Sequence, residues 1–419
     1  MSRPSPAVYR RRRIVVGAAL LVVALLATYL PVALFAPVPA ASAALVTLPE
    51  TGSPAVSLQT PAQGTSAIAV AGEGDDAAGL VLGSSGSTDS IPIASITKTI
   101  TALVVLDEKP IADGGQGPDI AITQQDADFL AATIAVGGSW ASVYPGQVLS
   151  ERQVIEIMML ESANNYSLTL TTWAFGSVDA YLAAATEWLA EKGLTGTAVA
   201  DTSGLDPGSR STTRDLLALG ALALADPVLA PIVGTASDTL PELGTIDNTN
   251  DLLGQIGIDG IKTGTTDEAG FCLLFSADYT VGDETFPLVG VVLGAPSEDQ
   301  LHASVLSLLQ SAQSGFQVLR VVSAGDVVGS YTTAWGAEAD VIATEDVDAT
   351  VWSGVEVTSS TEAENRESGA AGTEVGTARF DLAGVSLDGP EFTVPVALAS
   401  ELDGPDLGWR LANPGRLFG

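Results

Sequence analysis

A lysine at the start of an apolar segment is the feature that most limits how this chain can fold. Lys98 ends the segment Ile93-Ala94-Ser95-Ile96-Thr97-Lys98, and the run Thr99 to Leu106 that follows is dense in apolar residues. Pro92, which precedes this segment, restricts the residue before it to extended conformations. We therefore expect a helix to begin at about Ala94 or Ser95. Apolar residues on every side of that helix predict burial nearly all round. Burying a lysine is costly unless the site needs it.

Ser95 and Lys98 are three residues apart, so on a helix they share one face and the amine can reach the hydroxyl. The positive end of the helix disfavours a charged amine and favours an anion near Ser95. A serine beside an amine that can lose its proton is an activated nucleophile. Taken alone, the pair is better explained as a capping serine and a lysine that extends to solvent, so other motifs must decide.

Composition and charge exclude some classes of function. The chain has 419 residues, enough for two or three domains, and 46% of them are hydrophobic, so it can bury a large core. Five of the 17 basic residues lie in residues 1–43, which contain no acid, so all 50 acidic residues follow that segment. A surface this acidic repels phosphate backbones, and we expect no nucleic-acid partner. It suits an exported, soluble protein.

The chain contains one cysteine, Cys272, and one histidine, His302. Cys272 lies in an apolar run typical of a buried strand, and it has no second cysteine for an internal disulfide. Zinc sites need several His or Cys ligands, so we expect no metal site. His302 could complete a serine triad, but no G-x-S-x-G motif accompanies it. Serine chemistry here is therefore expected to use another base.

The N-terminus carries an export signal. Four arginines at positions 10–13 precede residues 14–36, which contain no charge and are long enough to span a bilayer with the N-terminus in the cytoplasm. Ala41-Ser42-Ala43 has the small-x-small form of a signal-peptidase site. Residues 1–43 are thus predicted to be either a cleaved signal peptide or a retained membrane anchor. In both cases the rest of the chain is expected outside the cytoplasm.

Changes in sequence texture predict the domain boundaries. Residues 44–65, rich in Pro, Ser, Thr and Gly, are expected to form a linker. Residues 66–318 alternate between predicted hairpins and helices. Strands are expected at 67–70, 79–82, 271–279 and 286–293, and helices at 151–160, 178–192, 214–225 and 297–316. Residues 319–419 contain short β-branched runs separated by Gly and Asp, which predict a β-sandwich-like domain.

Two further polar groups accompany the first motif: Ser162-Ala163-Asn164 and Lys262-Thr263-Gly264. Each alone is best explained as a helix end or a turn. In this order, however, the three groups resemble the serine-type D-alanyl-D-alanine carboxypeptidases, the low-molecular-mass penicillin-binding proteins. Ala163 departs from the usual Ser-Asp-Asn but leaves its serine and asparagine in place. The segments 201–206, 211–215 and 248–253 also look like that family, and the resemblance covers residues 66–316.

The resemblance implies an α+β fold for residues 66–318, the β-lactamase/transpeptidase-like domain. In that fold an antiparallel sheet is covered by helices, and a helical subdomain lies between Ser95 and Lys262. The all-β domain would follow it. The implied activity is removal of the terminal D-alanine from peptidoglycan stem peptides through an acyl-enzyme on Ser95, with no cofactor. Penicillins and other β-lactams would be covalent inhibitors, and the location would be the outer face of the membrane or the cell wall. Membrane attachment would rest on residues 14–36.

The resemblance also implies roles for single residues. Ser95 would attack the carbonyl, Lys98 would take its proton, and Ser162 would relay that proton to the leaving D-alanine. The expected substrate-binding residues are Asn164, which would also hold Lys98, and Lys262, Thr263, Gly264 and Thr265. The backbone N–H groups of Ser95 and Thr265 would form the oxyanion hole. Burial and the nearby Lys262 cation would both lower the pKa of Lys98.

Three alternatives stay open at this point. A class A β-lactamase shares the fold and the acyl-enzyme but uses an extra glutamate, usually in an E-x-x-L-N stretch, and none occurs between Asn164 and Lys262. A D,D-endopeptidase would cut cross-links with the same residues. A non-catalytic wall-binding scaffold would keep the fold without the chemistry, which the intact motifs disfavour.

Overall fold

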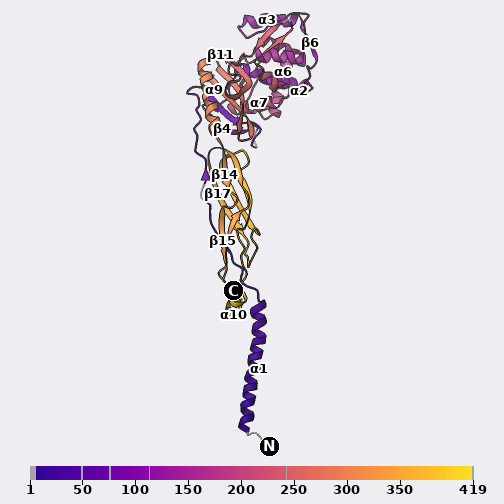
Figure 1. Cartoon of the computed structure of the whole chain (residues 1–419). Helices are drawn as coiled ribbons and strands as arrows, with labels where there is room; N and C mark the ends of the chain where they lie inside the picture. The colour runs from indigo at the N-terminus through magenta and orange to yellow at the C-terminus, as the bar shows by residue number, and fades with distance from the viewer. Residues whose placement is uncertain (1–5, 49–50, 75–76, 113, 242, 418–419) are drawn as a thin grey trace. The chain divides into compact units, whose positions relative to one another are not determined.

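The computed structural model describes residues 6–48, 51–74, 77–112, 114–241 and 243–417 (Figure 1). The chain divides into two compact units, which are described separately. The α/β unit comprises Pro54–Gln317 and Trp352–Gly354, and the β unit comprises Met1–Ser53, Val318–Val351 and Val355–Gly419.

A five-stranded antiparallel sheet forms the base of the α/β unit, with strand order β11-β12-β13-β3-β4. The strands are β3 (Thr65–Val70), β4 (Leu80–Ser85), β11 (Ile258–Thr266), β12 (Gly270–Val281) and β13 (Glu284–Ala295). The hairpins expected from the sequence are β3–β4 and β12–β13. Gly282, whose φ is +61°, makes the turn between β12 and β13.

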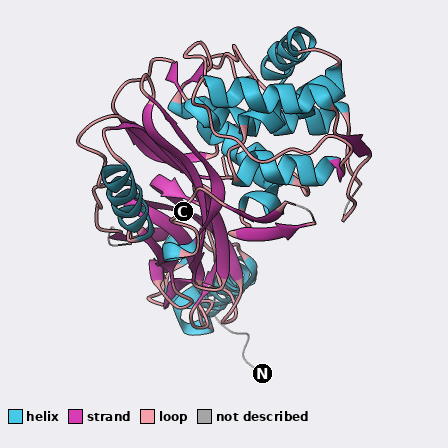
Figure 2. Ribbon diagram, turned by 90° about the horizontal axis from the view of Figure 1, so that it is seen from above, coloured by secondary structure: helices cyan, strands magenta, loops and turns pink. Residues whose placement is uncertain are grey.

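Helices gather beside this sheet, as Figure 2 shows. They are α2 (Thr97–Glu108), α3 (Gln124–Ala135), α4 (Glu151–Leu160), α5 (Asn164–Phe175), α6 (Val178–Glu191), α7 (Thr213–Ala225), α8 (Leu229–Val233) and α9 (Glu298–Gln313). Helices α7 and α9 both pack on β13, while α2 contacts α4, α5, α6 and α7. The α+β class and the helical subdomain are confirmed. The sequence patterns did not predict α3, α5 or the short α8.

Short elements complete the α/β unit. Strand β5 (Ile91–Pro92) pairs with β8 (Arg210–Ser211), β6 (Asp119–Ala121) with β7 (Val148–Ser150), and β9 (Ser237–Leu240) with β10 (Gly244–Asp247). Two 3-10 helices are η1 (Ala94–Ile96) and η2 (Gln255–Gly257).

Side-chain caps fix where helices α4 and α7 start. At α4, Oγ of Ser150 accepts from the backbone N–H of Gln153 at 3.2 Å, and Oε1 of Gln153 accepts from the Ser150 N–H at 2.9 Å. This capping box satisfies donors that have no partner inside the helix. Thr212 caps α7 by accepting from the N–H of Asp215 at 3.1 Å. Each cap joins residues that are three apart in the sequence, so the start of each helix does not depend on contacts between distant segments.

Helix α2 is the buried centre of the unit. Every residue from Thr97 to Leu106 is buried, including Lys98, as the apolar run predicted. The helix is preceded by η1, so Ser95 lies in a 3-10 turn and not in the α-helix itself. A central, fully packed helix gives the first motif a rigid support.

The β unit contains one hydrogen-bonded sheet of eight strands, with order β1-β15-β16-β19-β18-β17-β14 and β2 paired to β17. Its strands are β1 (Ala43–Leu45), β2 (Thr51–Gly52), β14 (Phe316–Val322), β15 (Val327–Thr332), β16 (Glu338–Ala343), β17 (Val347–Ala363), β18 (Glu374–Ser386) and β19 (Glu391–Leu398). The β-rich character of residues 319–419 is confirmed, although this segment also ends in short helical elements. Residues 44–65 were expected to form a linker, but they contain most of β1 and all of β2, and both strands pair with the sheet.

The N-terminal helix α1 (Pro6–Phe35) belongs to the β unit. It is long and apolar enough to cross a membrane, with a mean hydropathy of 2.4 over its most apolar 18 residues. The C-terminal elements of this unit are α10 (Leu407–Ala412) and η3 (Pro414–Arg416).

Candidate active site

The first predicted pair is in direct contact. Nζ of Lys98 lies 2.8 Å from Oγ of Ser95, at the junction of η1 and α2. Ala94, the residue before the serine, has a φ of +47°, a left-handed conformation that is unfavourable for alanine. This turn directs the chain into η1, and Ser95 stays partly exposed while its neighbours Ala94 and Ile96 are buried. A partly exposed hydroxyl on a buried amine is the geometry that nucleophile activation requires.

The Lys98 amine is fully buried, and its pKa is well below the ordinary lysine value. Burial is the largest cause, because an apolar surrounding disfavours the charged form. The positive charge of Lys262 lowers the pKa further, and Asp201 opposes both effects. The balance favours a neutral amine, which can accept a proton from the hydroxyl.

The second contact of Lys98 comes from a backbone carbonyl. Nζ of Lys98 donates to the carbonyl oxygen of Ser203 at 3.2 Å. The carboxylate of Asp201 shapes this turn, since it accepts from the N–H groups of Gly204 at 2.7 Å and Leu205 at 2.9 Å and from two serine hydroxyls. Sequence reasoning had placed this segment in the family pattern but gave it no role. A backbone carbonyl has no side-chain signature, so only the polar Asp201-Thr202-Ser203-Gly204 run could have indicated it.

Lys262 lies on β11, beside two threonine hydroxyls. Its Nζ is 3.4 Å from Oγ1 of Thr263 and 3.4 Å from Oγ1 of Thr249, and the two hydroxyl oxygens are 2.6 Å apart. Only 1% of Lys262 is exposed, and burial lowers its pKa to about 7. Thr249 itself is exposed, and sequence reasoning did not identify it. Two hydroxyls and an amine at the edge of a sheet form a suitable seat for a carboxylate.

Gly264 brings β11 against the serine. A Cβ at this position would lie 2.9 Å from the carbonyl oxygen of Ile93 and 3.0 Å from the backbone nitrogen of Ser95. Side chains do not approach backbone atoms so closely, so glycine is needed for β11 and η1 to pack together. Thr265 follows on the same strand and is exposed. The arrangement places the backbone of β11 beside the N–H of Ser95.

The middle motif lies between α4 and α5. Ser162 is 6% exposed and has a φ of +54°, which ends α4 and turns the chain toward α5. The preceding Leu160 carbonyl accepts from the N–H of Thr249 at 3.2 Å, so this turn is tied to the segment that contacts Lys262. This backbone hydrogen bond links the turn that carries Ser162 to the segment beside Lys262.

Asn164 is placed differently from the expectation. Its backbone N–H donates to the Ser139 carbonyl at 2.8 Å, and its Oδ1 is buried without a hydrogen-bond partner among the described residues. Its side chain makes no hydrogen bond with Lys98 in the described part of the chain, and Lys98 donates instead to the Ser203 carbonyl. The unpartnered amide oxygen can still accept a hydrogen bond from an N–H group.

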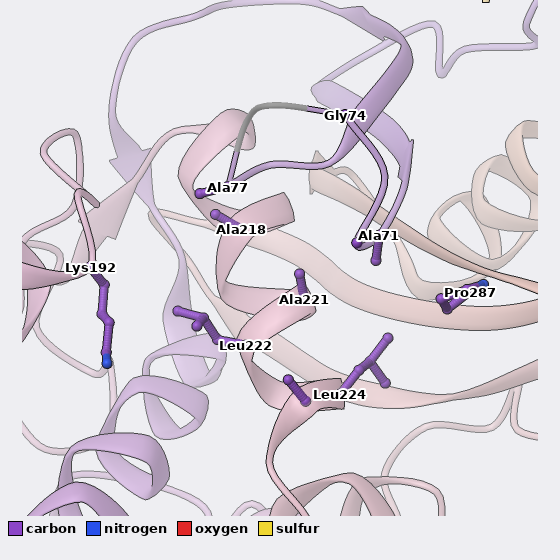
Figure 3. Close-up of a pocket in the computed structure, with 11 residues that line it drawn as sticks. Ala71, Gly74, Ala77, Lys192, Ala218, Ala221, Leu222, Leu224 and Pro287 are labelled. Carbon is purple, nitrogen blue, oxygen red and sulfur yellow. The ribbon is translucent and has the colours of Figure 1, made fainter. Parts of the chain in front are cut away.

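Two hollows in the surface of the α/β unit differ in whether predicted site residues line them. One of about 280 Å³ is lined by Asn164 and Ser203, with apolar walls that include Val136, Leu168 and Leu205. A larger hollow of about 490 Å³ lies between the β3–β4 turn and α7 and is drawn in Figure 3. Among the described residues that line it, Lys192 is the one charged side chain, and none of them is a predicted site residue. The smaller hollow is thus the one of the two that a predicted site residue, Asn164, lines, and the Ser203 carbonyl that contacts Lys98 belongs to a residue of the same wall.

Comparison with known proteins gives one family. The profile of the D-alanyl-D-alanine carboxypeptidase family matches residues 56–297, more than half of the chain. The D-alanyl-D-alanine carboxypeptidase DacC of Escherichia coli is 31% identical over 228 residues, which cover 54% of this chain and 56% of the relative. A D-alanyl-D-alanine endopeptidase of Pseudomonas aeruginosa is 31% identical over 208 residues, covering 48% and 64%. The chain thus spans little more than half the length of the curated relatives it matches.

Solved structures agree on the fold. Penicillin-binding protein 5 from Haemophilus influenzae superposes with a TM-score of 0.55 at 20% identity, covering 83% of this chain and 98% of that one. At this identity the likeness concerns the fold and leaves the chemistry to the residues.

Proposed function

The chain belongs to the D-alanyl-D-alanine carboxypeptidase family, and from that premise we propose that it removes the terminal D-alanine from peptidoglycan stem peptides outside the cytoplasm. The observation that carries the proposal is the contact of 2.8 Å between Ser95 Oγ and the buried amine of Lys98. The polar seat around Lys262 supports it, because a carboxypeptidase must hold a free terminal carboxylate.

In the first step, Oγ of Ser95 attacks the carbonyl carbon of the penultimate D-alanine, and its proton passes to the neutral amine of Lys98. The developing oxyanion is held by the backbone N–H groups of Ser95 and Thr265, which lie on the two segments that Gly264 brings together. The bond from this carbon to the leaving nitrogen then breaks. Ser162 carries the proton to that nitrogen, and D-alanine leaves as the free amino acid.

The acyl group is now an ester of Ser95, and a water molecule hydrolyses it. Attack of water on the ester carbon returns the proton to Ser95 Oγ and releases the shortened peptide as a carboxylic acid. Lys98 can take the proton of that water as it took the proton of the serine. A β-lactam would form the same ester but keep its leaving nitrogen in the ring system, so it would act as a covalent inhibitor.

The charge balance at Lys262 fits recognition of the peptide end. A bound carboxylate raises the pKa of a neighbouring amine, so the cation that burial disfavours is restored when substrate arrives. Thr263 and Thr249 supply hydroxyls to the same carboxylate. A substrate without a free carboxylate at this position would give Lys262 no anion, so the positive charge that burial disfavours would not be restored.

The decisive experiment measures D-alanine release from a diacyl-D-Ala-D-Ala peptide together with labelling by a fluorescent penicillin, followed by intact mass. The wild-type protein should release D-alanine and gain the mass of one penicillin, and Ser95→Ala should do neither. Labelling of Ser95→Ala at the wild-type rate would remove Ser95 from its role. Wild-type labelling without D-alanine release, but with cleavage of a cross-linked dimer, would instead favour the endopeptidase.

A further inference from the structure

The outer end of α1 is held by the C-terminal segment of the chain. Helix α10 packs against α1, and Nη1 of Arg410 donates to the carbonyl oxygens of Ala36 at 2.9 Å and Leu34 at 3.3 Å. The hydroxyl of Tyr29 donates to the Leu411 carbonyl. The last carbonyls of a helix have no partner within it and form the negative end of its dipole. The arginine therefore satisfies both the hydrogen bonds and the charge at this end.

The chain enters the sheet soon after α1 ends. Ala41 exchanges backbone hydrogen bonds of 2.8 and 2.9 Å with Arg366, β1 pairs with β15, and the N–H of Val46 donates to the Val328 carbonyl at 2.9 Å. The small-residue segment 41–43, a candidate cleavage site, is thus paired with the sheet. Proteases act on accessible, unpaired chain, so this segment is protected once the unit has folded.

Helix geometry places α10 at a definite depth. A hydrocarbon core of about 30 Å takes about 20 residues at 1.5 Å per residue. Counted from Ile14, the first residue after the four arginines, that length ends near Leu34. This is the level at which Arg410 contacts α1, so the C-terminal segment meets the helix where the outer acyl chains end and the headgroups begin.

The residues exposed at that level suit such an interface. Leu407 is 65% exposed and Phe35 is 83% exposed. Trp409 packs edge-on against Trp335, with ring centroids 5.7 Å apart. Tryptophan and tyrosine gather where a membrane meets water, and arginine extends to the same level. The surface made by Phe35, Leu407 and Trp409 is named the base surface below.

We propose that residues 1–43 remain part of the mature protein and that Arg410 fastens the C-terminal segment to the outer end of α1. The base surface then lies on the outer leaflet of the bilayer that α1 crosses. The occupant is the lipid of that bilayer, because the transmembrane helix fixes where the surface sits. This inference does not depend on the proposed enzymatic activity.

The first test is the mass of the full chain expressed in a bacterium and extracted from its membranes with detergent. Retention predicts a mass that includes residues 1–43, and a carbonate wash should leave the protein in the membrane. A mature N-terminus at Ala44 would overturn the proposal.

A second test places Trp409 in the lipid. In proteoliposomes containing brominated phosphatidylcholine, tryptophan near the acyl chains loses fluorescence. Trp409→Phe should remove most of the quenchable part, whereas Trp140→Phe, which removes an exposed tryptophan of the α/β unit, should leave it unchanged. Equal quenching in wild type and Trp409→Phe would overturn the placement of the base surface.

A third test concerns the Arg410 contact in the same proteoliposomes. Amide hydrogen exchange of residues 407–412 should be about tenfold faster in Arg410→Ala, the loss expected for one charge-assisted hydrogen bond. The matched control is Arg416→Ala, an exposed arginine of η3, which should exchange as the wild type does. Unchanged exchange in Arg410→Ala would overturn the fastening role.

Discussion

The surroundings of Lys98 and Lys262 differ, although both side chains are buried, with 0% and 1% of their surface exposed. Lys98 contacts the nucleophile hydroxyl and a backbone carbonyl, and Lys262 contacts two threonine hydroxyls at a sheet edge. Burial lowers the pKa of both, but Lys98 also feels the positive charge of Lys262. The same residue type thus has two surroundings: Lys98 lies beside a hydroxyl toward which a neutral amine can act as a base, and Lys262 lies where a bound anion would restore its charge.

This difference shows that burial alone does not decide the role of a lysine. In an apolar surrounding each amine prefers to be neutral, and the partner that arrives determines the outcome. At Lys98 the partner is the Ser95 hydroxyl, and a neutral amine can act as a base toward it. A carboxylate would restore the charge on Lys262. Substitutions that change charge and shape independently can therefore distinguish the surroundings of Lys98 from those of Lys262.

The largest effect is expected for Lys98→Arg, and Lys262→Arg is the comparison. A guanidinium cannot give up its proton in a protein, so Lys98→Arg should lower the rate of acylation by about 10³-fold or more. Lys262→Arg keeps a cation for the carboxylate and should stay within about tenfold of the wild type. Both rates are measured with a fluorescent penicillin and with a D-Ala-D-Ala peptide. Equal losses in the two variants would show that the lysines are not divided into base and cation.

Gly264→Ala tests the contact that joins the two neighbourhoods. Its Cβ would meet the Ile93 carbonyl oxygen and the Ser95 nitrogen, and backbone atoms cannot move aside as a flexible side chain can. A displacement of Ser95 by about 1 Å should cost about 10²-fold in kcat. The variant should still fold, as its circular dichroism would show.

Gly415→Ala serves as the control for Gly264→Ala, because an added Cβ there meets nothing within 4 Å. It should retain full activity. A fully active Gly264→Ala would mean that β11 and η1 need not approach so closely.

Local patterns in the sequence accounted for much of the fold. The capping box at Ser150 and the cap at Thr212 are satisfied within three residues, so the chain alone indicates where α4 and α7 begin. The apolar run after Lys98 predicted a buried α2 for the same reason. Each of these features depends on neighbours in sequence, which a pattern can represent.

Helix α5 shows where local patterns fail. Its segment is rich in threonine and serine, which are poor helix formers, and the sequence patterns predict no helix there. In the structure these hydroxyls are buried and paired across the fold: Ser167 with Thr202 at 2.8 Å, and Thr169 with Asp126 at 2.7 Å. The partners come from other segments, so the helix depends on tertiary contacts that the local sequence does not contain.

The candidate site divides in the same way. The three motifs identify Ser95, Lys98, Ser162 and Lys262, whose side chains we propose for the chemistry. The Ser203 carbonyl that contacts Lys98 and the Thr249 hydroxyl beside Lys262 lie in segments 201–206 and 248–253, which resemble the family but receive no role from the sequence. A carbonyl is present at every residue, and threonine is common, so neither has a distinctive pattern. Only their positions in space distinguish them.

The pH dependence of kcat/KM should separate the two amines. As pH rises through about 7, Lys262 of the free protein loses its proton, so carboxylate binding and kcat/KM should fall by about tenfold per pH unit. As pH falls through the lowered pKa of Lys98, that amine gains a proton and kcat/KM should fall again. Lys262→Arg should remove the alkaline decline and keep the acidic one. An alkaline decline unchanged in Lys262→Arg would assign it to another group.

The smallest effect is expected at Thr249, which tests whether the carboxylate seat extends beyond the motif. Thr249→Val keeps the shape but removes the hydroxyl that lies 2.6 Å from Thr263 and 3.4 Å from Lys262. Loss of one hydrogen bond to a charged group should raise KM about tenfold while kcat changes little, because binding is lost equally in the ground and transition states. Thr249→Ser, which keeps the hydroxyl, should stay near the wild type.

A substrate whose terminal carboxylate is converted to an amide makes this test specific. The amide should be a poor substrate for the wild type. Thr249→Val should raise KM for the amide little further, because the hydroxyl no longer faces a charged oxygen. Equal losses for the acid and the amide would mean that Thr249 only supports β11. A loss confined to the acid would make the hydroxyl part of the seat, and the division between the two lysines would then rest on their neighbours as well as on their charge.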